Sequence, residues 1–461
     1  MISSLWSLFF KKIKKYKYNS PLTPVKHFNI TQDSSIPKLS WLCEIENNIY
    51  NVTVGKGVEY GDNFIVEGVW DEEFCDLEFH TSDHFYGSGI FVDSNNIAYF
   101  VPPRQLTDFL YVLYDKRSKK SYISNSFNFI FRRINIDIKG EFFLNFKNSL
   151  HDSSNRESKM GADSGDPLIA EDNEYVMYRM MYHNFTIDDK GRINYCMQST
   201  HRMEANTFED YKNFLLETTK KIIKNAESKD RRHSLGSITM CSTGYDSSAV
   251  SAICASSGVK DAITLDVVTA GHNDCGDKIA ELLGLNCIKV QGYLGKNVGN
   301  LSLKLAIEAN EEVLEFFATP GLGDNIVFYP MEEYLTDKIV FSGLYGDGFW
   351  SKKGGENSLV HGIPYMKSRN EFRLRTGYYI IPTPAFGAFF TDKLYKIVND
   401  RSMLPYTLHT SYDRPIPRRI CEEAGIPRDW FGQEKAANNP HVINQMEFFD
   451  IAVQHVMNRY K

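Results

Sequence analysis

Residues 237–255 read Ser-Ile-Thr-Met-Cys-Ser-Thr-Gly-Tyr-Asp-Ser-Ser-Ala-Val-Ser-Ala-Ile-Cys-Ala, and this stretch decides the fold of the second half of the chain. Its first part, 237–241, is a short and mostly apolar run that ends in a turn signal, as is typical of a strand in a parallel sheet. Residues 248–255 carry small and apolar side chains at helical spacing, and Gly258 stands where a helix would stop. The sequence therefore predicts a strand, a loop and a helix in that order.

The loop between this strand and this helix has the chemistry of a phosphate site. Unpaired backbone N–H groups and the positive end of the helix dipole favour an anion at a helix N-terminus. Gly244 permits close backbone approach, while a carboxylate at Asp246 would repel phosphate unless a cation bridged the two. Mg²⁺ is the natural bridge, because it takes one or two carboxylates together with phosphate oxygens. The residues expected to hold the pyrophosphate of ATP are Ser242, Thr243, Gly244, Tyr245, Asp246, Ser247 and Ser248.

This loop resembles the Ser-Gly-Gly-x-Asp-Ser loop of the PP-loop ATP pyrophosphatases, with Thr243 in place of the first glycine. That family cleaves ATP between the α and β phosphates. The chain contains no Gly-x-x-x-x-Gly-Lys-Ser/Thr stretch, so the loop is not of the Walker type. Taken alone, the heptapeptide is also compatible with an ordinary Ser/Gly turn that caps a helix.

A second loop of the same kind follows later in the chain. Residues 338–343 read as a buried strand and run into the Gly-rich turn 344–350, which carries one carboxylate at Asp347. Open α/β sheets gather their ligand-binding residues where strands end in such turns. We therefore expect Asp347 to be the second metal ligand beside Asp246.

The two loops together resemble the synthetase domain of the asparagine synthetase and β-lactam synthetase family, whose second loop reads roughly Ser-Gly-x-Gly-x-Asp-Glu-x-Phe. This chain keeps Ser342, Gly343, Asp347 and an aromatic residue at Phe349. It departs from the family at Gly348, which stands where the family usually carries Glu. The resemblance implies that Gly343 belongs to the nucleotide-binding residues.

The segments between the two loops alternate between strand and helix. Residues 262–268 and 287–290 read as strands, and residues 274–283 read as a helix that Gly284 stops. Such alternation predicts a parallel, doubly wound α/β sheet. By the resemblance, the backbone near Leu265 would hold the adenine and Asp266 would contact the ribose. A helix-capping or solvated Asp266 is an equally open interpretation.

A third similarity lies near the C-terminus. The stretch 414–419 leads through 424–427 to Gly432-Gln433-Glu434-Lys435, which is similar to the family segment that ends in a catalytic lysine. Lys435 in that place would neutralise a developing oxyanion and the phosphate of the leaving AMP. A surface lysine is the alternative, since charged side chains are mostly exposed.

Residues 1–205 are predicted to form a β-rich domain that precedes the adenylating domain at 206–461. The aromatic and β-branched runs 89–92, 97–101 and 109–114 read as strands, and the last continues through a polar turn into a hairpin. This pattern is similar to the Ntn-like α+β glutaminase domain of the same family. Functional glutaminase domains use a cysteine directly after the initiator Met, and this chain has Ile2 there. We therefore expect no glutamine hydrolysis.

Composition narrows the function classes further. The chain has 461 residues, a net charge of −6, 42% hydrophobic and 24% charged residues, so nothing in it favours nucleic-acid binding. Eight cysteines without a Cys-x-x-Cys pair suit a reducing, cytoplasmic location. The apolar run at residues 5–10 precedes its lysines, unlike a secretory signal, and is too short for a transmembrane segment.

The sequence thus predicts an ATP- and Mg²⁺-dependent ligase that adenylates a carboxylate and passes the acyl group to an amine. The expected partners are a small-molecule or peptide carboxylate and amine, with a precursor peptide or a partner enzyme as a candidate. This is the logic of lactam and macrolactam synthetases, which resemble asparagine synthetase without an ammonia supply. Two alternatives stay open: a PP-loop enzyme of nucleoside or RNA modification or sulfur transfer, and a non-catalytic ATP-binding scaffold.

Overall fold

The computed structural model describes residues 24–104, 108–136, 140–142, 145, 168–188, 190–196, 203–266, 268–269, 272–291, 328–352, 370–410 and 412–433. The chain forms two compact units. Unit 1 comprises Met1–Val69, Leu77–Thr200 and Met366–Arg375, and unit 2 comprises Trp70–Asp76, His201–Tyr365 and Thr376–Lys461. The main division, between residues 200 and 201, lies near the predicted boundary at 205/206. In addition, unit 1 includes residues 366–375 and unit 2 includes residues 70–76, which the sequence pattern does not predict.

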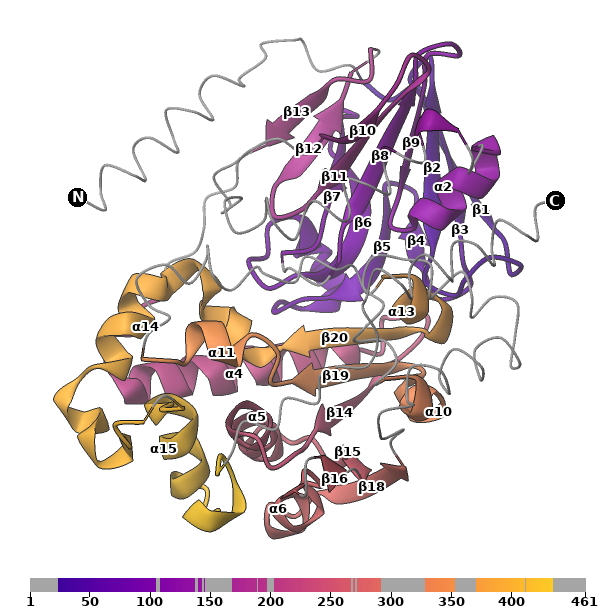
Figure 1. The fold of residues 1–461 in the computed structure, drawn as a ribbon. Coiled ribbons are helices and arrows are strands. Elements are labelled where there is room, and N and C mark those ends of the chain that lie inside the picture. The colour runs from indigo at the N-terminus through magenta and orange to yellow at the C-terminus, as the bar shows by residue number, and fades with distance from the viewer. Residues whose placement is uncertain are drawn as a thin grey trace. The chain divides into compact units, whose positions relative to one another are not determined.

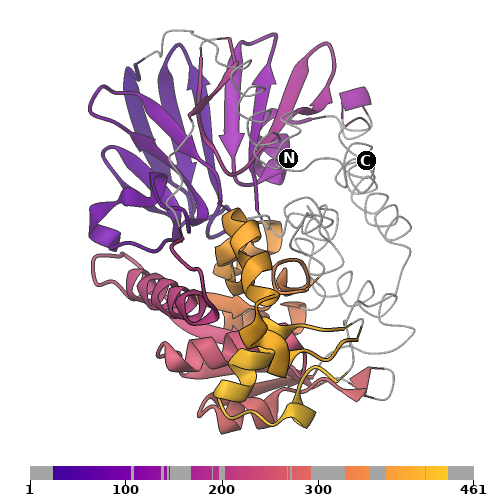
Figure 2. The same ribbon diagram turned by 90° about the vertical axis from the view of Figure 1, so that its left-hand side faces the viewer.

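Unit 1 is built on two β-sheets (Figures 1 and 2). The seven-stranded sheet runs in the order β1 (His27–Gln32), β3 (Ile49–Val54), β2 (Trp41–Glu46), β9 (Lys120–Ser124), β8 (Leu110–Asp115), β11 (Tyr175–Met180) and β10 (Leu168–Glu171). The six-stranded sheet runs in the order β13 (Ile193–Cys196), β12 (Asn184–Ile187), β7 (Ala98–Val101), β6 (Tyr86–Val92), β5 (Phe64–Val69) and β4 (Glu59–Gly61). The predicted hairpin is confirmed as β8 and β9, which pair antiparallel.

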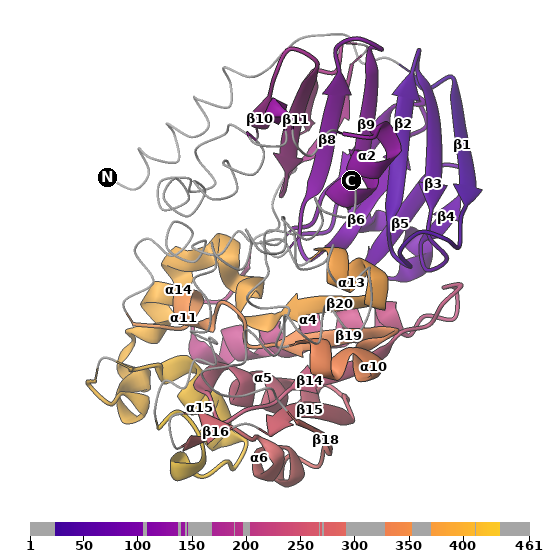
Figure 3. The same ribbon diagram turned by 45° about the vertical axis from the view of Figure 1, so that its right-hand side comes forward.

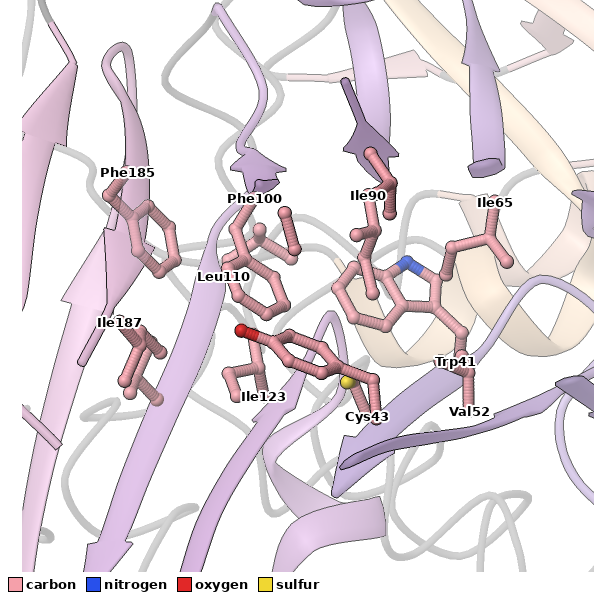
Figure 4. Close-up of a cluster of buried hydrophobic side chains, with 14 of the residues drawn as sticks. Trp41, Cys43, Val52, Ile65, Ile90, Phe100, Leu110, Ile123, Phe185 and Ile187 are labelled. Carbon is pink, nitrogen blue, oxygen red and sulfur yellow. The ribbon is translucent and has the colours of Figure 1, made fainter. Parts of the chain in front are cut away.

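The core of unit 1 is the apolar layer between these two sheets (Figure 4). Alternate residues of each strand point into it, as a half-buried sheet requires. Trp41 and Cys43 enter from β2, and Phe100 and Phe185 enter from the other sheet and stack with ring centroids 5.3 Å apart. Helix α2 (Phe127–Ile134) lies on the outer face of the seven-stranded sheet (Figure 3).

The segment 366–375 belongs to unit 1 through buried charge. It contains most of helix α13 (Asn370–Thr376), and its Arg373 donates to both carboxylate oxygens of Glu67 at 2.8 and 3.0 Å. The same guanidinium lies 3.1 Å from Asp108, and all three side chains are almost fully buried. Buried ions need such partners, because an unpaired one is very costly. This ionic triad fixes the segment in unit 1.

Unit 2 contains a five-stranded parallel sheet, as the sequence predicts (Figures 1 and 3). Its order is β18 (Asn286–Gln291), β15 (Asp261–Asp266), β14 (Gly236–Met240), β19 (Lys338–Ser342) and β20 (Tyr378–Pro382). Every neighbouring pair is parallel. Numbered by their place in the chain, these strands follow the order 3-2-1-4-5, which is typical of doubly wound sheets.

The helices of unit 2 begin with α4 (Phe208–Ala226), which carries a capping box: the Thr207 hydroxyl accepts from the N–H of Asp210, whose carboxylate accepts from the N–H of Thr207. Helix α5 (Tyr245–Ser256) packs on β14 and β19. The other α-helices in the described part of this unit are α6 (Asp277–Leu282), α10 (Glu332–Leu335), α11 (Gly346–Phe349), α14 (Thr391–Val398) and α15 (Pro415–Glu423). Short 3₁₀ turns lie at Phe74–Asp76 and Glu78–His80, and at Tyr329–Met331, Thr383–Phe390, Arg401–Tyr406 and Arg428–Trp430.

Two boundaries differ from the prediction for a physical reason. Helix α5 begins at Tyr245, so Asp246 lies in its first turn, where a carboxylate is favoured by the helix dipole. Helix α6 begins at Asp277 and not at Asp274, because residues 272–273 form the short strand β17, paired with β16 (Val268–Thr269). Cys275 also pairs with Ser242 through their backbones in an isolated antiparallel β-bridge. Within the described residues, no helix has the length and apolarity needed to cross a membrane.

Candidate functional site

The candidate site lies in unit 2 at the carboxyl ends of β14 and β19. These two strands are neighbours, and the chain winds away from them in opposite directions along the sheet. In open α/β sheets, ligands bind outside the carboxyl ends of the strands at this switch point. The two loops singled out in the sequence follow these two strands, so the fold brings them to the same place.

The second loop packs directly on the first. A Cβ atom added to Gly343 would come within 2.6 Å of the Ser247 backbone nitrogen, and one added to Gly346 within 2.2 Å of Asp246 Cγ. Only glycine permits so close an approach of backbone to side chain. Between the two glycines, Tyr345 adopts a left-handed conformation with φ of 68°. Such a conformation is costly for a bulky residue and turns the chain sharply here.

Asp246 and Asp347, the two predicted metal ligands, are brought together by one arginine. Arg414 Nη1 lies 2.5 Å from Asp246 Oδ2, and its Nη2 forms an ion pair with Asp347 Oδ1. The Arg414 side chain is 5% exposed, that of Asp246 17% and that of Asp347 59%. A buried guanidinium thus pairs with one shielded and one exposed carboxylate, and its single charge balances one of their two.

The serine hydroxyls of the first loop have partners inside the loop. The Ser242 and Ser247 hydroxyls lie 2.7 Å apart. The Ser248 hydroxyl donates to the carbonyls of Ser242 and Gly244 at 2.9 and 2.8 Å and is buried, so Ser248 holds the loop in shape. Ser242 and Ser247 are half-buried and are therefore the more accessible of the three serines.

Thr243 is bound to a carboxylate that the sequence pattern does not single out. Its N–H and its hydroxyl donate to Asp274 Oδ1 at 3.2 and 2.8 Å. Burial raises the pKa of Asp274, against the opposing effect of these hydrogen bonds. The Asp274 carboxylate therefore accepts hydrogen bonds from the same N–H and hydroxyl of Thr243 that a bound phosphate would need as donors.

Tyr245 points away from the loop into an aromatic and cationic cluster formed with the C-terminal part of unit 2. Its ring lies 4.9 Å from that of Tyr412 and 5.8 Å from that of Phe431. Arg418 of α15 donates to the Tyr245 hydroxyl and lies over both Tyr245 and Phe431. The N–H of Gly432 donates to the Thr243 carbonyl at 2.8 Å, so this segment closes over the loop.

The remaining residues that the sequence analysis named are Leu265, Asp266, Ser342 and Lys435. Leu265 and Asp266 end β15, next to β14, and Asp266 accepts from the Gln291 amide at 2.9 Å. Ser342, which ends β19, is buried, and its hydroxyl has no hydrogen-bond partner among the described residues. Lys435 lies outside the described residues.

Two carboxylates held this closely fit the requirements of a Mg²⁺–phosphate complex. Within the part of the chain that the structure describes, no group of three or more His, Cys, Asp or Glu side chains gathers into a metal site. Mg²⁺ needs no such group, because it keeps several waters and uses one or two carboxylates with substrate phosphates. Asp246 and Asp347 are the residues that would hold such an ion, which would supply positive charge next to a bound phosphate.

Arg414 and Asp274 are the two site residues that the sequence reasoning missed. Arg414 stands 168 residues from Asp246, and Asp274 stands 31 residues from Thr243, so no local spacing links either pair. The stretch 414–419 contains Arg414, but the sequence reasoning used it only to place Lys435 and did not single out this arginine.

No protein-family model and no curated protein sequence matches this chain.

Proposed function

We propose that this protein is an ATP- and Mg²⁺-dependent ligase that adenylates a carboxylate and forms an amide bond with an amine of the same or a second substrate. The observation that carries the proposal is the meeting of Asp246 and Asp347 at the switch point of the parallel sheet. The close packing of Gly343 and Gly346 on the first loop supports it, because this packing brings the metal-binding and phosphate-binding loops together.

The chemistry would run in two steps. A substrate carboxylate oxygen attacks the α-phosphorus of ATP, the bond between the α-phosphorus and the bridging oxygen breaks, and pyrophosphate leaves. The amine then attacks the acyl carbon, the bond to AMP breaks, and the amine releases one proton. The α5 N-terminus and the hydroxyls of Ser242 and Ser247 would bind the pyrophosphate, and Asp246 and Asp347 would bind the metal. Lys435 is proposed to stabilise the second step.

The proposal includes the finer identity of the two units. Unit 2 would be a PP-loop ATP pyrophosphatase domain and unit 1 a degenerate glutaminase-like domain. Unit 1 has two cysteines, Cys43 and Cys196, and burial raises the pKa of both thiols, that of Cys196 to about 11. A nucleophilic thiol needs a lowered pKa, so neither is suited to glutamine hydrolysis. All eight cysteines are free thiols, which suits a reducing cytoplasm.

The test is ATP–pyrophosphate exchange with a panel of carboxylic and amino acids, followed by trapping of the adenylate with hydroxylamine. We expect acid-dependent exchange and hydroxamate in the wild type, and loss of both in Asp246→Ala. Asp392→Ala is the matched control, because Asp392 lies at the start of α14, outside the site. Exchange that survives Asp246→Ala would contradict the proposal.

A non-catalytic nucleotide-binding protein is the second candidate. Two observations favour it. Gly348 stands where the asparagine synthetase family usually carries Glu, and residues of the chain already occupy the site, with Arg414 paired to Asp347 and Thr243 bound to Asp274. Tight binding of ATP without exchange for any acid would favour this role over catalysis. Exchange that requires RNA or a nucleoside would instead favour a modifying enzyme.

A further inference from the structure

Arg414 occupies the position in the site where positive charge is needed. Its guanidinium faces Asp246 at the start of α5 and Asp347 in α11, two carboxylates from different loops. We propose that Arg414 is a positioning residue that couples metal binding to phosphate binding. It pairs with both carboxylates when no nucleotide is bound, and it turns to the phosphates when a divalent ion takes the carboxylates. This inference rests on the proposed function.

The surroundings of Arg414 hold the guanidinium in place. It precedes Pro415, the first residue of α15, and α15 packs on α5. Its guanidinium carbon lies 5.1 Å from the centre of the Tyr412 ring, a cation–π arrangement. With 5% of the side chain exposed, Arg414 is anchored in the protein, whereas Asp347 is open to solvent.

The coupling follows from charge balance. A divalent ion and the guanidinium compete for the same two carboxylates: the guanidinium balances one of the two negative charges, whereas a divalent ion balances both. If the ion binds, Arg414 loses its partners while it stays buried, and an uncompensated buried charge is strongly destabilising. Phosphate oxygens relieve this cost, since a guanidinium binds them through paired, charge-assisted hydrogen bonds. Metal alone should therefore bind poorly, and metal together with phosphate should bind well.

The coupling must also be reciprocal. If nucleotide raises the affinity for the metal, the metal raises the affinity for nucleotide by the same factor. Asp274 strengthens the effect. Its carboxylate accepts a hydrogen bond from the Thr243 hydroxyl in the loop 242–248, and its negative charge disfavours a phosphate that binds there without a cation. Arg414 thereby makes the site selective for the metal complex of a nucleotide over either component.

The decisive measurement is Mn²⁺ binding, followed by the loss of the free-ion signal in electron paramagnetic resonance and corrected for the Mn²⁺ that the analogue binds without protein. Wild type, Arg414→Gln, Arg414→Lys and Arg419→Gln are titrated with Mn²⁺ alone and with Mn²⁺ plus α,β-methylene ATP, which cannot be cleaved at the reactive bond. Arg419 is the matched control: it lies on α15, the helix that Arg414 precedes, and pairs with Glu209 and Glu423 outside the site.

We expect wild type and Arg419→Gln to bind Mn²⁺ at least about tenfold more tightly with the analogue than without it, the size of one charge-assisted interaction. Arg414→Gln should bind Mn²⁺ alone about tenfold more tightly than wild type, and should lose most of the effect of the analogue. Arg414→Lys should fall between, because one ammonium group cannot face both carboxylates as a planar fork does.

The outcomes separate this inference from the proposed function. Wild type that binds the metal–analogue complex, with Arg414→Gln no better at binding Mn²⁺ alone, overturns the role of Arg414 and leaves the nucleotide site standing. Wild type that binds neither form overturns the proposed function itself. If Arg414→Gln does not fold, the wild type and Arg414→Lys still decide the matter. Equal Mn²⁺ affinity of the wild type with and without the analogue would refute the coupling.

Discussion

Gly346 lies against the carboxyl group of Asp246 so closely that a Cβ atom at position 346 would come within 2.4 Å of Asp246 Oδ1. The two residues belong to loops that follow neighbouring strands, and their contact fixes the distance between the two candidate metal ligands. The site therefore depends on an absent side chain as much as on the charged ones.

Gly346→Ala should displace Asp246 and reduce the exchange activity by about 100-fold, because a shift of roughly 1 Å in a positioned group has effects of this size. The affinity for the metal complex of α,β-methylene ATP should fall as well. Gly236→Ala is the control: its new Cβ meets the flexible end of Lys338 in the same sheet. Full activity in Gly346→Ala would show that the contact is not required.

Arg373→Met should lower the free energy of unfolding of unit 1 by about 3–5 kcal/mol, because Glu67 and Asp108 would remain buried without their cation. Equilibrium unfolding in urea, followed by circular dichroism, measures this loss. Arg133→Met is the control, since its ion pair with Glu44 lies at the surface, with the Arg133 side chain 56% exposed, and should be worth less than about 1 kcal/mol. Similar losses in the two variants would contradict the importance of the buried triad.

Glu371 should make unit 1 less stable as the pH rises. Burial raises the pKa of its carboxyl group from 4.5 to about 7, despite hydrogen bonds from Ser126 at 2.8 and 3.0 Å. The folded state then binds the proton more tightly than the unfolded state, so this contribution is complete below pH 4.5 and is lost as the pH passes 7. The total change is on the order of 3 kcal/mol.

Glu371→Gln should remove this pH dependence, because an amide stays neutral. Urea unfolding at pH 5 and at pH 8 measures it: relative to wild type, Glu371→Gln should be more stable at pH 8 than at pH 5. Glu217→Gln on α4 is the control, since Glu217 is solvated beside Lys220. A wild-type stability that does not fall between these pH values, relative to Glu371→Gln, would disprove the effect.

Tyr211→Phe should destabilise unit 2 by about 1–3 kcal/mol, because the buried indole N–H of Trp350 would lose its acceptor. That N–H donates to the Tyr211 hydroxyl at 2.8 Å and links the end of α11 to α4. Thermal unfolding measures the loss. Tyr60→Phe, whose hydroxyl makes a 3.4 Å contact to Gln32 near the surface, should change little. An unchanged melting temperature in Tyr211→Phe would mean that another group satisfies the indole.

Local sequence determined the elements of this protein. The strand, turn and helix at 237–255, the capped helix after Thr207 and the hairpin of β8 and β9 all follow from contacts within a few residues. Periodicity and turn chemistry express such short-range preferences directly. The alternation of strands and helices also predicted the parallel sheet, and so placed Asp246 and Asp347 at the same edge.

Only the tertiary structure decided which charged and polar residues of these elements pair with each other. Nothing near Asp246 in the chain indicates that Arg414, 168 residues away, would neutralise it. The same holds for Asp274 on Thr243, and for Arg373, which lies 306 residues from Glu67. A buried charge selects its partner by distance in space, because desolvation makes any unpaired ion costly wherever its partner stands in the sequence. The sequence pattern therefore specified which loops form the candidate site, and tertiary packing specified that Arg414 and Asp274 pair with the residues of these loops.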